Sequence, residues 1–320
     1  MTYSVASFAF WRAYFIQMRP YLFYVSGVAG WTGLALADEY PKSPALFWAT
    51  FFAFLTSYGF GQALTDTFQI DTDELSAPYR PLSQGIISAS VVRTVSIVGL
   101  LVDGGILIMA NPRNVWLCVM SIAGLATYSF IKRRYWFGGP FYNAWIVALL
   151  PLMGFLCLTD GSLAMAGQRL DIRLVSILSF CAYTNFVLIG YLKDITADRQ
   201  TGYRTFPVVF GWNATVWVGD VVAVISSLIC LLIIENPVSV AGLFWLAATL
   251  SAGWGQGYAH LTTRKTEENS ALPVINTVRS FIGWHLAVIV AAQPTSALWC
   301  AVFYVLFEIV LATRPINHQI

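Results

Sequence analysis

The hydrophobic positions of this chain are gathered into long, nearly unbroken runs separated by short polar segments. The runs lie at 20–37, 44–64, 86–110, 114–131, 141–159, 172–192, 213–234, 239–259, 273–293 and 296–312. Each is close to the roughly 20 apolar residues that a helix needs to cross a bilayer. Because lipid offers the backbone no hydrogen-bond partner, we expect each run to be helical. The pattern predicts an all-α, polytopic transmembrane helical bundle of nine or ten helices, in which the last two runs form either a hairpin or one broken helix.

Composition supports the membrane interpretation. Hydrophobic residues make up 58% of the 320 residues and charged residues only 11%, whereas soluble domains carry roughly 25% charged residues. The formal net charge of +2 gives no basis for binding nucleic acid. The connections are short and none is of low complexity, so we expect a single integral membrane domain over 1–320.

The distribution of lysine and arginine predicts the orientation of the bundle. With the N-terminus in the cytoplasm, 14 of these cations lie on the cytoplasmic side and 4 on the other side. Cytoplasmic loops of membrane proteins carry the excess of positive charge. We therefore expect a multi-pass protein, in contact with membrane lipids, whose N-terminus and polar loops are cytoplasmic.

The polar segment with the clearest chemistry is 193–205, which follows the sixth run. Asp194 and Asp198 are four residues apart and would share one face of a helix. Two carboxylates so placed repel each other unless a cation lies between them, and hard oxygen ligands suit Mg²⁺, which also binds phosphate oxygens. Lys193, Arg199 and Arg204 are suited to neutralise a diphosphate. The alternative is a solvated loop with incidental charges.

A second acidic segment, 65–85, follows the second run. Asp66, Gln69 and Asp73 are spaced to share one helical face if the helix continues, whereas Asp71 joins them only if the helix ends near residue 70. Pro78 and Pro81 end any helix that precedes them. The alternative is a charged helix terminus at the membrane surface.

Three consecutive cations, Lys132, Arg133 and Arg134, follow the fourth run. They are able to bind phosphate or to anchor the helix at anionic headgroups. For Arg133 and Arg134 we favour the anchor, and Lys132 is the better diphosphate candidate. Farther along the chain, Asp220 and Arg279 both lie near cytoplasmic helix starts and are expected to pair.

Together these segments resemble the UbiA superfamily of intramembrane prenyltransferases, which carries acidic motifs on its second and sixth helices and a basic loop after the fourth. The second motif of that family matches closely in Lys193, Asp194, Asp198, Gly202 and Thr205. The stretch 79–85, which contains Arg80, resembles the sequence that follows its first motif. The first motif departs from the family pattern, because Thr65 replaces the usual Asn and Gln69 the middle Asp, while Asp71 is added.

The resemblance implies an all-helical enzyme in which both acidic segments hold Mg²⁺ against the diphosphate of an allylic donor of the farnesyl or geranylgeranyl class. It implies catalytic roles for Asp66, Asp73, Asp194 and Asp198. The metal ligands would come from these four with Gln69 and Asp71, and diphosphate binding from Arg80 and the cations Lys132, Lys193, Arg199 and Arg204. We expect Asp71 to supply the charge that Gln69 lacks.

Three functions are open at this stage. The leading one is a prenyltransferase that joins the isoprenyl chain to an aromatic or lipid acceptor. An alternative is a membrane terpene cyclase of the same superfamily, in which an internal double bond traps the cation without a separate acceptor. A transporter is a remote alternative, because the acidic residues gather at the loops and not at the midplane of broken helices.

Overall fold

The computed structural model describes residues 2–37, 43–159 and 161–314. Every regular element in these ranges is a helix. The elements are α1 (Phe8–Gln17), η1 (Pro20–Leu22), α2 (Phe23–Ala35), α3 (Pro44–Asp66), α4 (Ile70–Ser76), α5 (Ala89–Ala110), α6 (Asn114–Arg134), α7 (Pro140–Cys157), α8 (Leu163–Gln168), α9 (Leu170–Gly190), η2 (Tyr191–Lys193), α10 (Ile195–Gln200), α11 (Phe206–Ile234), α12 (Val240–Leu261), η3 (Glu267–Ser270), α13 (Ala271–Ala292), η4 (Pro294–Ser296) and α14 (Ala297–Ala312). The predicted all-α bundle is confirmed.

Each of the ten predicted hydrophobic runs has its own helix, and the last two are separate helices, α13 and α14. By length and composition, seven helices of the described chain are suited to cross a membrane. They are Ala89–Ala110, Asn114–Arg134, Pro140–Cys157, Leu170–Lys193, Phe206–Ile234, Glu267–Ala292 and Pro294–Ala312. These spans establish an integral membrane protein and agree broadly with the predicted number of helices.

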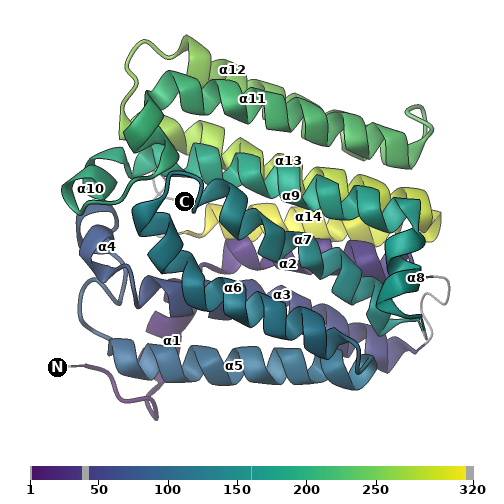
Figure 1. The fold of residues 1–320 in the computed structure, drawn as a ribbon, viewed down its shortest axis with the longest axis horizontal. Coiled ribbons are helices and arrows are strands. Elements are labelled where there is room, and N and C mark those ends of the chain that lie inside the picture. Colours follow the sequence, from purple (N-terminus) through teal and green to yellow (C-terminus); the bar gives the residue numbers. More distant parts are fainter. Residues whose placement is uncertain (1, 38–42, 160, 315–320) are drawn as a thin grey trace.

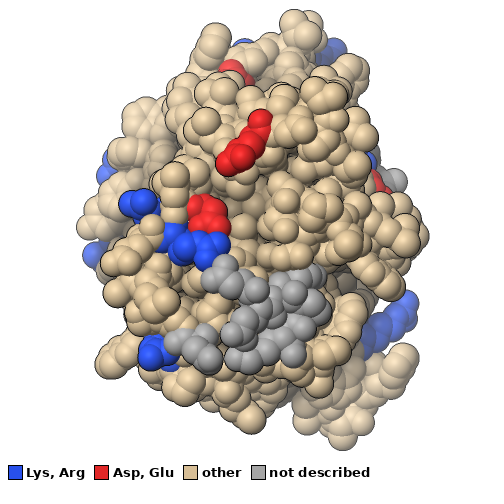
Figure 2. All heavy atoms as spheres, turned by 90° about the vertical axis from the view of Figure 1, so that its right-hand side faces the viewer, with Lys and Arg blue, Asp and Glu red and all other residues tan. Residues whose placement is uncertain are grey.

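The long helices lie side by side, and the short helices gather at the two ends of the bundle (Figure 1). Helices α4 and α10 contact each other at one end, and α8 lies at the opposite end. Among the described residues, the end that carries α8 is mostly uncharged, with one group of basic side chains beside an acidic one (Figure 2). The two acidic segments therefore meet at one end of the bundle.

Helix α13 forms the centre of the bundle, because 83% of the residues in its most apolar stretch are buried. It packs against α2, α9, α11 and α12. Helices α2 and α7 approach most closely where glycines face backbone: a Cβ on Gly33 would lie 1.9 Å from the carbonyl oxygen of Pro151, and one on Gly154 would lie 2.2 Å from that of Gly30. Such small residues let helices pack backbone to backbone in a membrane.

The predicted pair of Asp220 with Arg279 is wrong. Asp220 on α11 lies 2.6 Å from the His260 ring on α12, and Arg279 on α13 makes two 2.7 Å contacts with Glu308 on α14. Each charged side chain finds its partner on the helix that packs against its own. A position near a helix start does not show which helix that is.

Candidate active site

A polar cavity of about 100 Å³ opens where α3, α4, α6 and α9 converge. Its charged lining consists of Arg19, Asp66, Asp73, Arg80, Lys132, Lys193 and Asp194. Four cations therefore face three carboxylates. This excess of positive charge, together with oxygen ligands, favours an anionic ligand that brings a metal ion with it.

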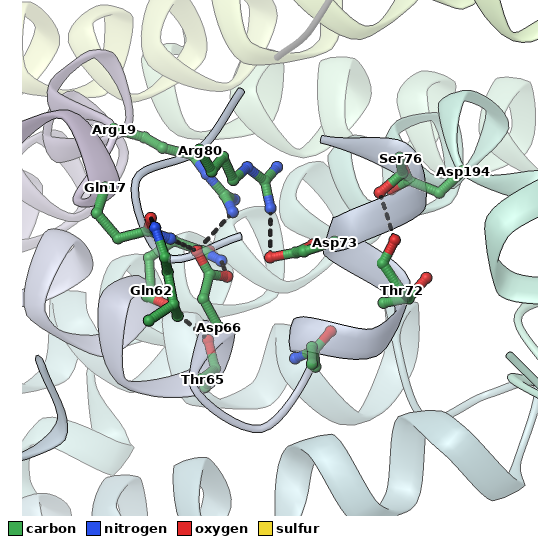
Figure 3. A network of polar contacts seen from close by, with 12 residues as sticks. Gln17, Arg19, Gln62, Thr65, Asp66, Thr72, Asp73, Ser76, Arg80 and Asp194 are labelled. Carbon is green, nitrogen blue, oxygen red and sulfur yellow. Dashed lines mark hydrogen bonds and ion pairs between the residues drawn. The ribbon is translucent and has the colours of Figure 1, made fainter. Parts of the chain in front are cut away.

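Asp66, the last residue of α3, is the most densely bonded carboxylate of the cavity (Figure 3). It accepts hydrogen bonds from Gln17 (2.6 Å), Arg19 (2.8 Å) and Gln62 (2.7 Å). Gln17 also accepts from the backbone N–H of Leu82 at 3.1 Å. The N-terminal helix α1 and the loop after α4 are thus both tied to the end of α3.

Arg19 reaches Asp66 from a backbone conformation that is rare for a residue other than glycine. Its φ is 54°, in the left-handed region, between α1 and the 3₁₀ turn that starts at Pro20. Its Nε atom is buried without a hydrogen-bond partner among the described residues, as is the Nε of Arg80. Strained residues are often found at binding sites, and two unpaired guanidinium N–H groups fit an anionic ligand.

Asp73 comes from the short helix α4, on the other side of the break at residues 67–69. It forms a 2.7 Å ion pair with Arg80 (Figure 3), and both side chains are almost fully buried. Burial raises the pKa of Asp73 above its ordinary value, against the opposing effect of Arg80. Because the helix breaks after Asp66, the single continuous face expected for residues 66, 69 and 73 is not formed, yet all three line the cavity.

Gln69 connects the first acidic segment to α6. Its carbonyl oxygen accepts from Lys132 Nζ at 2.6 Å, and its amide donates to Ser129 Oγ at 3.2 Å. Lys132 is only 7% exposed, and its ammonium lies 5.0 Å from the ring centre of Tyr191. Gln69 therefore holds the buried cation at the cavity wall.

The two carboxylates of the second segment have different surroundings. Asp194 lines the cavity and accepts from Lys193 at 2.7 and 2.9 Å. Burial acts to raise the pKa of Asp194, but the neighbouring cations Lys193, Lys132 and Arg80 together outweigh it and lower that pKa below its ordinary value. Asp198 lies behind this wall, where it accepts from Thr72 (3.2 Å) and Thr205 (3.0 Å). Burial raises the pKa of Asp198 to about 6, although Lys132 acts to lower it.

Four of the predicted site residues do not line the cavity: Asp198, which lies behind its wall, and Asp71, Arg199 and Arg204. Asp71 is half-exposed and pairs with Arg133 on the outer side of α4. Arg199 and Arg204 are exposed and absent from the lining. The Asp71 carboxylate therefore does not line the part of the chamber that Gln69 lines.

The sequence pattern did not single out several lining residues. Gln17 and Gln62 were not noted, and Arg19, whose place before Pro20 and the first apolar run fits the family resemblance, was not assigned to the site. The cavity also contains Tyr58, Tyr128, Tyr183 and Tyr191, which form hydroxyl pairs: Tyr58 with Tyr183 at 3.0 Å and Tyr128 with Tyr191 at 3.0 Å. In a chain rich in aromatic residues, periodicity does not separate such tyrosines from those that face lipid.

A second, larger cavity of about 270 Å³ adjoins the polar one between α3, α5, α6 and α7. Its lining is mainly aliphatic and aromatic. Five residues belong to both cavities: Tyr58, Gln62, Tyr128, Asn143 and Tyr183. The site therefore joins a charged chamber to a hydrocarbon-lined one.

The donor set of the polar cavity fits Mg²⁺ that is shared with a phosphate ligand. No three Asp, Glu, His or Cys side chains of the described chain converge into a preformed cage. Mg²⁺ typically takes only one or two carboxylates and fills its other positions with water and substrate phosphates. Asp66, Asp73 and Asp194, with the amide oxygen of Gln69, offer such ligands on both sides of the chamber.

Comparison with known sequences agrees with this chemistry. The sequence model of the UbiA prenyltransferase family matches residues 26–285. The chain is 26% identical over 250 residues to the digeranylgeranylglyceryl phosphate synthase of Methanospirillum hungatei JF-1, which covers 74% of this chain and 81% of that protein. It is 25% identical over 222 residues to the synthase of the same name from Thermococcus kodakarensis, covering 67% and 75%.

Solved structures share the fold. A UbiA homologue from Aeropyrum pernix K1 superposes with a TM-score of 0.69 at 17% identity, covering 82% of this chain and 95% of that one. A UbiA homologue from Archaeoglobus fulgidus bound to DMAPP and Mg²⁺ superposes with a TM-score of 0.64 at 16% identity, covering 86% and 98%. The match of the family model over most of the chain confirms the predicted resemblance: this protein belongs to the UbiA prenyltransferase family.

Proposed function

We propose that this prenyltransferase ionises an allylic isoprenyl diphosphate of the farnesyl or geranylgeranyl class and passes the prenyl group to a lipid acceptor within the membrane. The observation that carries this proposal is the joining of the two cavities. A diphosphate needs the charged chamber and a prenyl chain needs the apolar one, and five shared residues lie at the junction.

Arg80, Lys132 and Lys193 would bind the diphosphate, since each presents a cation to the chamber. Asp66, Asp73 and Asp194 would hold Mg²⁺, with Gln69 as a further oxygen ligand. When bound, Mg²⁺ supplies positive charge that stabilises the leaving diphosphate. In the reaction the bond between the allylic carbon and oxygen breaks and its electron pair leaves with the diphosphate. The acceptor hydroxyl oxygen then bonds to the carbon and gives up its proton to the released diphosphate.

The protein groups at the junction would keep this carbon away from water. The rings of Tyr58, Tyr128 and Tyr183 surround the passage, and their hydroxyls are engaged in hydrogen bonds with neighbouring side chains. An electron-rich ring face is attracted to positive charge. A lipid acceptor is supported by the relatives, whose names describe synthesis of a glyceryl phosphate lipid.

The reaction is tested with purified protein in detergent. Farnesyl or geranylgeranyl diphosphate and Mg²⁺ are supplied with a glyceryl phosphate lipid, with an aromatic acceptor or with no acceptor, and prenylated products and free diphosphate are measured. We expect transfer to the lipid acceptor and loss of turnover in excess EDTA. Full turnover in EDTA contradicts the metal assignment, and cyclic hydrocarbons formed without any acceptor favour the terpene cyclase.

We propose that the site opens to the cytoplasm, as the cation distribution predicts. Gln200 on α10 is exposed beside the site, and Val238 is 93% exposed in the turn between α11 and α12. In intact cells a membrane-impermeant thiol reagent should label Val238→Cys and should label Gln200→Cys only after permeabilisation. The reverse pattern contradicts this orientation.

A further inference from the structure

Among the residues that line the apolar cavity, one carries a carboxyl group. Asp103 lies in the transmembrane helix α5, is 7% exposed and lines the cavity among aliphatic neighbours. Its partner, Thr56 on α3, precedes Asp66 by ten residues, which is about 15 Å along the helix axis. Asp103 thus lies far from the charged chamber, and the reaction proposed for that chamber does not use it. An ionisable residue within the membrane that faces a cavity points to a function.

The carboxyl of Asp103 is poorly satisfied. Thr56 Oγ1 lies 3.1 and 3.0 Å from its two oxygens, but the same hydroxyl lies 2.8 Å from the carbonyl oxygen of Phe52. A hydroxyl has one hydrogen to donate, so the carboxyl and the carbonyl share it. Burying a carboxyl with so few partners is costly, and any further hydrogen bond to it must come from the cavity side.

A second polar group that lines the cavity has no hydrogen-bond partner among the described residues. The Oγ atom of Ser121 on α6 is buried and makes no hydrogen bond within the described residues, and Ser121 lines the cavity. A Cβ on Gly104, next to Asp103, would lie 3.8 Å from Cys118 Sγ, so Ser121 is about one turn nearer the charged chamber. The apolar cavity therefore has a polar zone formed by Asp103 and Ser121.

The cavity continues beyond this zone. Leu107, one turn farther along α5, and Met153 on α7 still line it. A hydrocarbon chain that enters from the charged chamber meets Asp103 before it reaches these residues. To go farther, it must cover the carboxyl and exclude any other hydrogen-bond donor from it, which disfavours the longer chain.

We propose that Asp103, assisted by Ser121, sets the length of the prenyl chain that the apolar cavity accepts. This inference rests on the proposed function, in which that cavity holds the prenyl tail. A chain that ends before Asp103 leaves the carboxyl free to be hydrated, and a longer one is selected against by desolvation of the carboxyl. Asp103 thereby determines specificity without touching the reacting atoms.

The test compares kcat/KM for geranylgeranyl and farnesyl diphosphates, with the same acceptor, in wild-type protein, Asp103→Leu and Asp103→Asn. Leucine replaces the carboxyl with a similarly shaped apolar group, so the geranylgeranyl-to-farnesyl ratio should rise about tenfold, the scale of discrimination in an apolar pocket. Asparagine keeps the polarity and the contact with Thr56, so its ratio should stay within about twofold of wild type.

A merely structural role would lower both kcat/KM values together and leave the ratio unchanged in Asp103→Leu, which overturns the proposal. If Asp103→Leu does not fold, Ser121→Ala takes its place: a rise of the ratio by about threefold is expected, and a wild-type ratio overturns the proposal. Turnover of neither diphosphate by wild-type protein contradicts the proposed function itself and, with it, the assignment of the cavity to a prenyl chain.

Discussion

The two acidic segments, residues 66–73 and 194–198, are built alike but use their carboxylates differently. In each, a long helix ends, the chain breaks, and a short helix follows: α3 leads to α4, and α9 leads through η2 to α10. In the first segment Asp66 and Asp73, on either side of the break, both line the cavity. In the second, Asp194 lines it and Asp198 bonds to Thr72 and Thr205 behind the wall.

The difference shows that two carboxylates close together in the sequence need not have the same role. Asp194 and Asp198 are four residues apart, but Asp194 precedes α10 and Asp198 lies within it. The break turns the first carboxylate to the chamber and leaves the second facing α4. The second segment therefore contributes one carboxylate to the ligand and one to the contact between the two segments.

The largest effect is expected from removing a cavity-facing charge on either segment. Asp66→Asn and Asp194→Asn should each lower turnover at least about 100-fold, the scale of losing one group that stabilises developing charge. Diphosphate release from the allylic donor measures this effect, and thermal unfolding in detergent checks the fold. Near-normal turnover in Asp194→Asn would show that the second segment does not hold the metal.

The second-largest effect is expected from Asp198→Asn, which distinguishes the role of Asp198 from that of Asp194. Asp198→Asn should also lower turnover, because the Asp198 charge acts on Lys132 and Asp194. Unlike Asp194→Asn, it should in addition lower the free energy of unfolding by about 1–3 kcal/mol, since Thr72 and Thr205 lose a charged acceptor. Equal melting temperatures for the two variants would contradict the tie between α10 and α4.

A smaller effect is expected at Gln69 in the first segment. Gln69→Ala removes the acceptor of Lys132 and a candidate metal ligand, so turnover should fall about tenfold. Gln69→Asp is the matched variant: it restores a carboxylate at this position and should keep activity and Mg²⁺ dependence. Unchanged turnover in Gln69→Ala would instead favour compensation by another residue.

The smallest effect is expected from Asp71→Ala. Its carboxylate is half-exposed and pairs with Arg133 away from the cavity, and such surface pairs contribute about 0–1 kcal/mol. Turnover should therefore stay within about threefold of wild type. A strong loss of Mg²⁺-dependent turnover would support the prediction from the sequence that Asp71 supplies the charge missing at Gln69.

The hydrophobic runs were sufficient to predict the helices, because a span of apolar residues in lipid has few other ways to satisfy its backbone. Ten runs became ten helices. The family resemblance came from the three polar segments together, of which the second acidic segment matches most closely, with its lysine and glycine at the expected spacing. Of the three consecutive cations at 132–134, Lys132, the favoured diphosphate candidate, is the one that lines the chamber. These features depend on residues that are close together in the sequence, so the sequence is sufficient to predict them.

The side on which each polar residue lies depended on how the helices end and pack. Asp71 and Gln69 are two residues apart, yet one is paired at the surface and the other faces the chamber, because the chain breaks at residues 67–69. Gln17 reaches Asp66 from α1, 49 residues away along the chain, and Arg19 reaches it from the turn after α1, 47 residues away. Asp103 and its partner Thr56 are likewise 47 residues apart along the chain. Such contacts arise only when distant helices pack, because burial leaves each polar group to find a partner on whichever helix lies beside it.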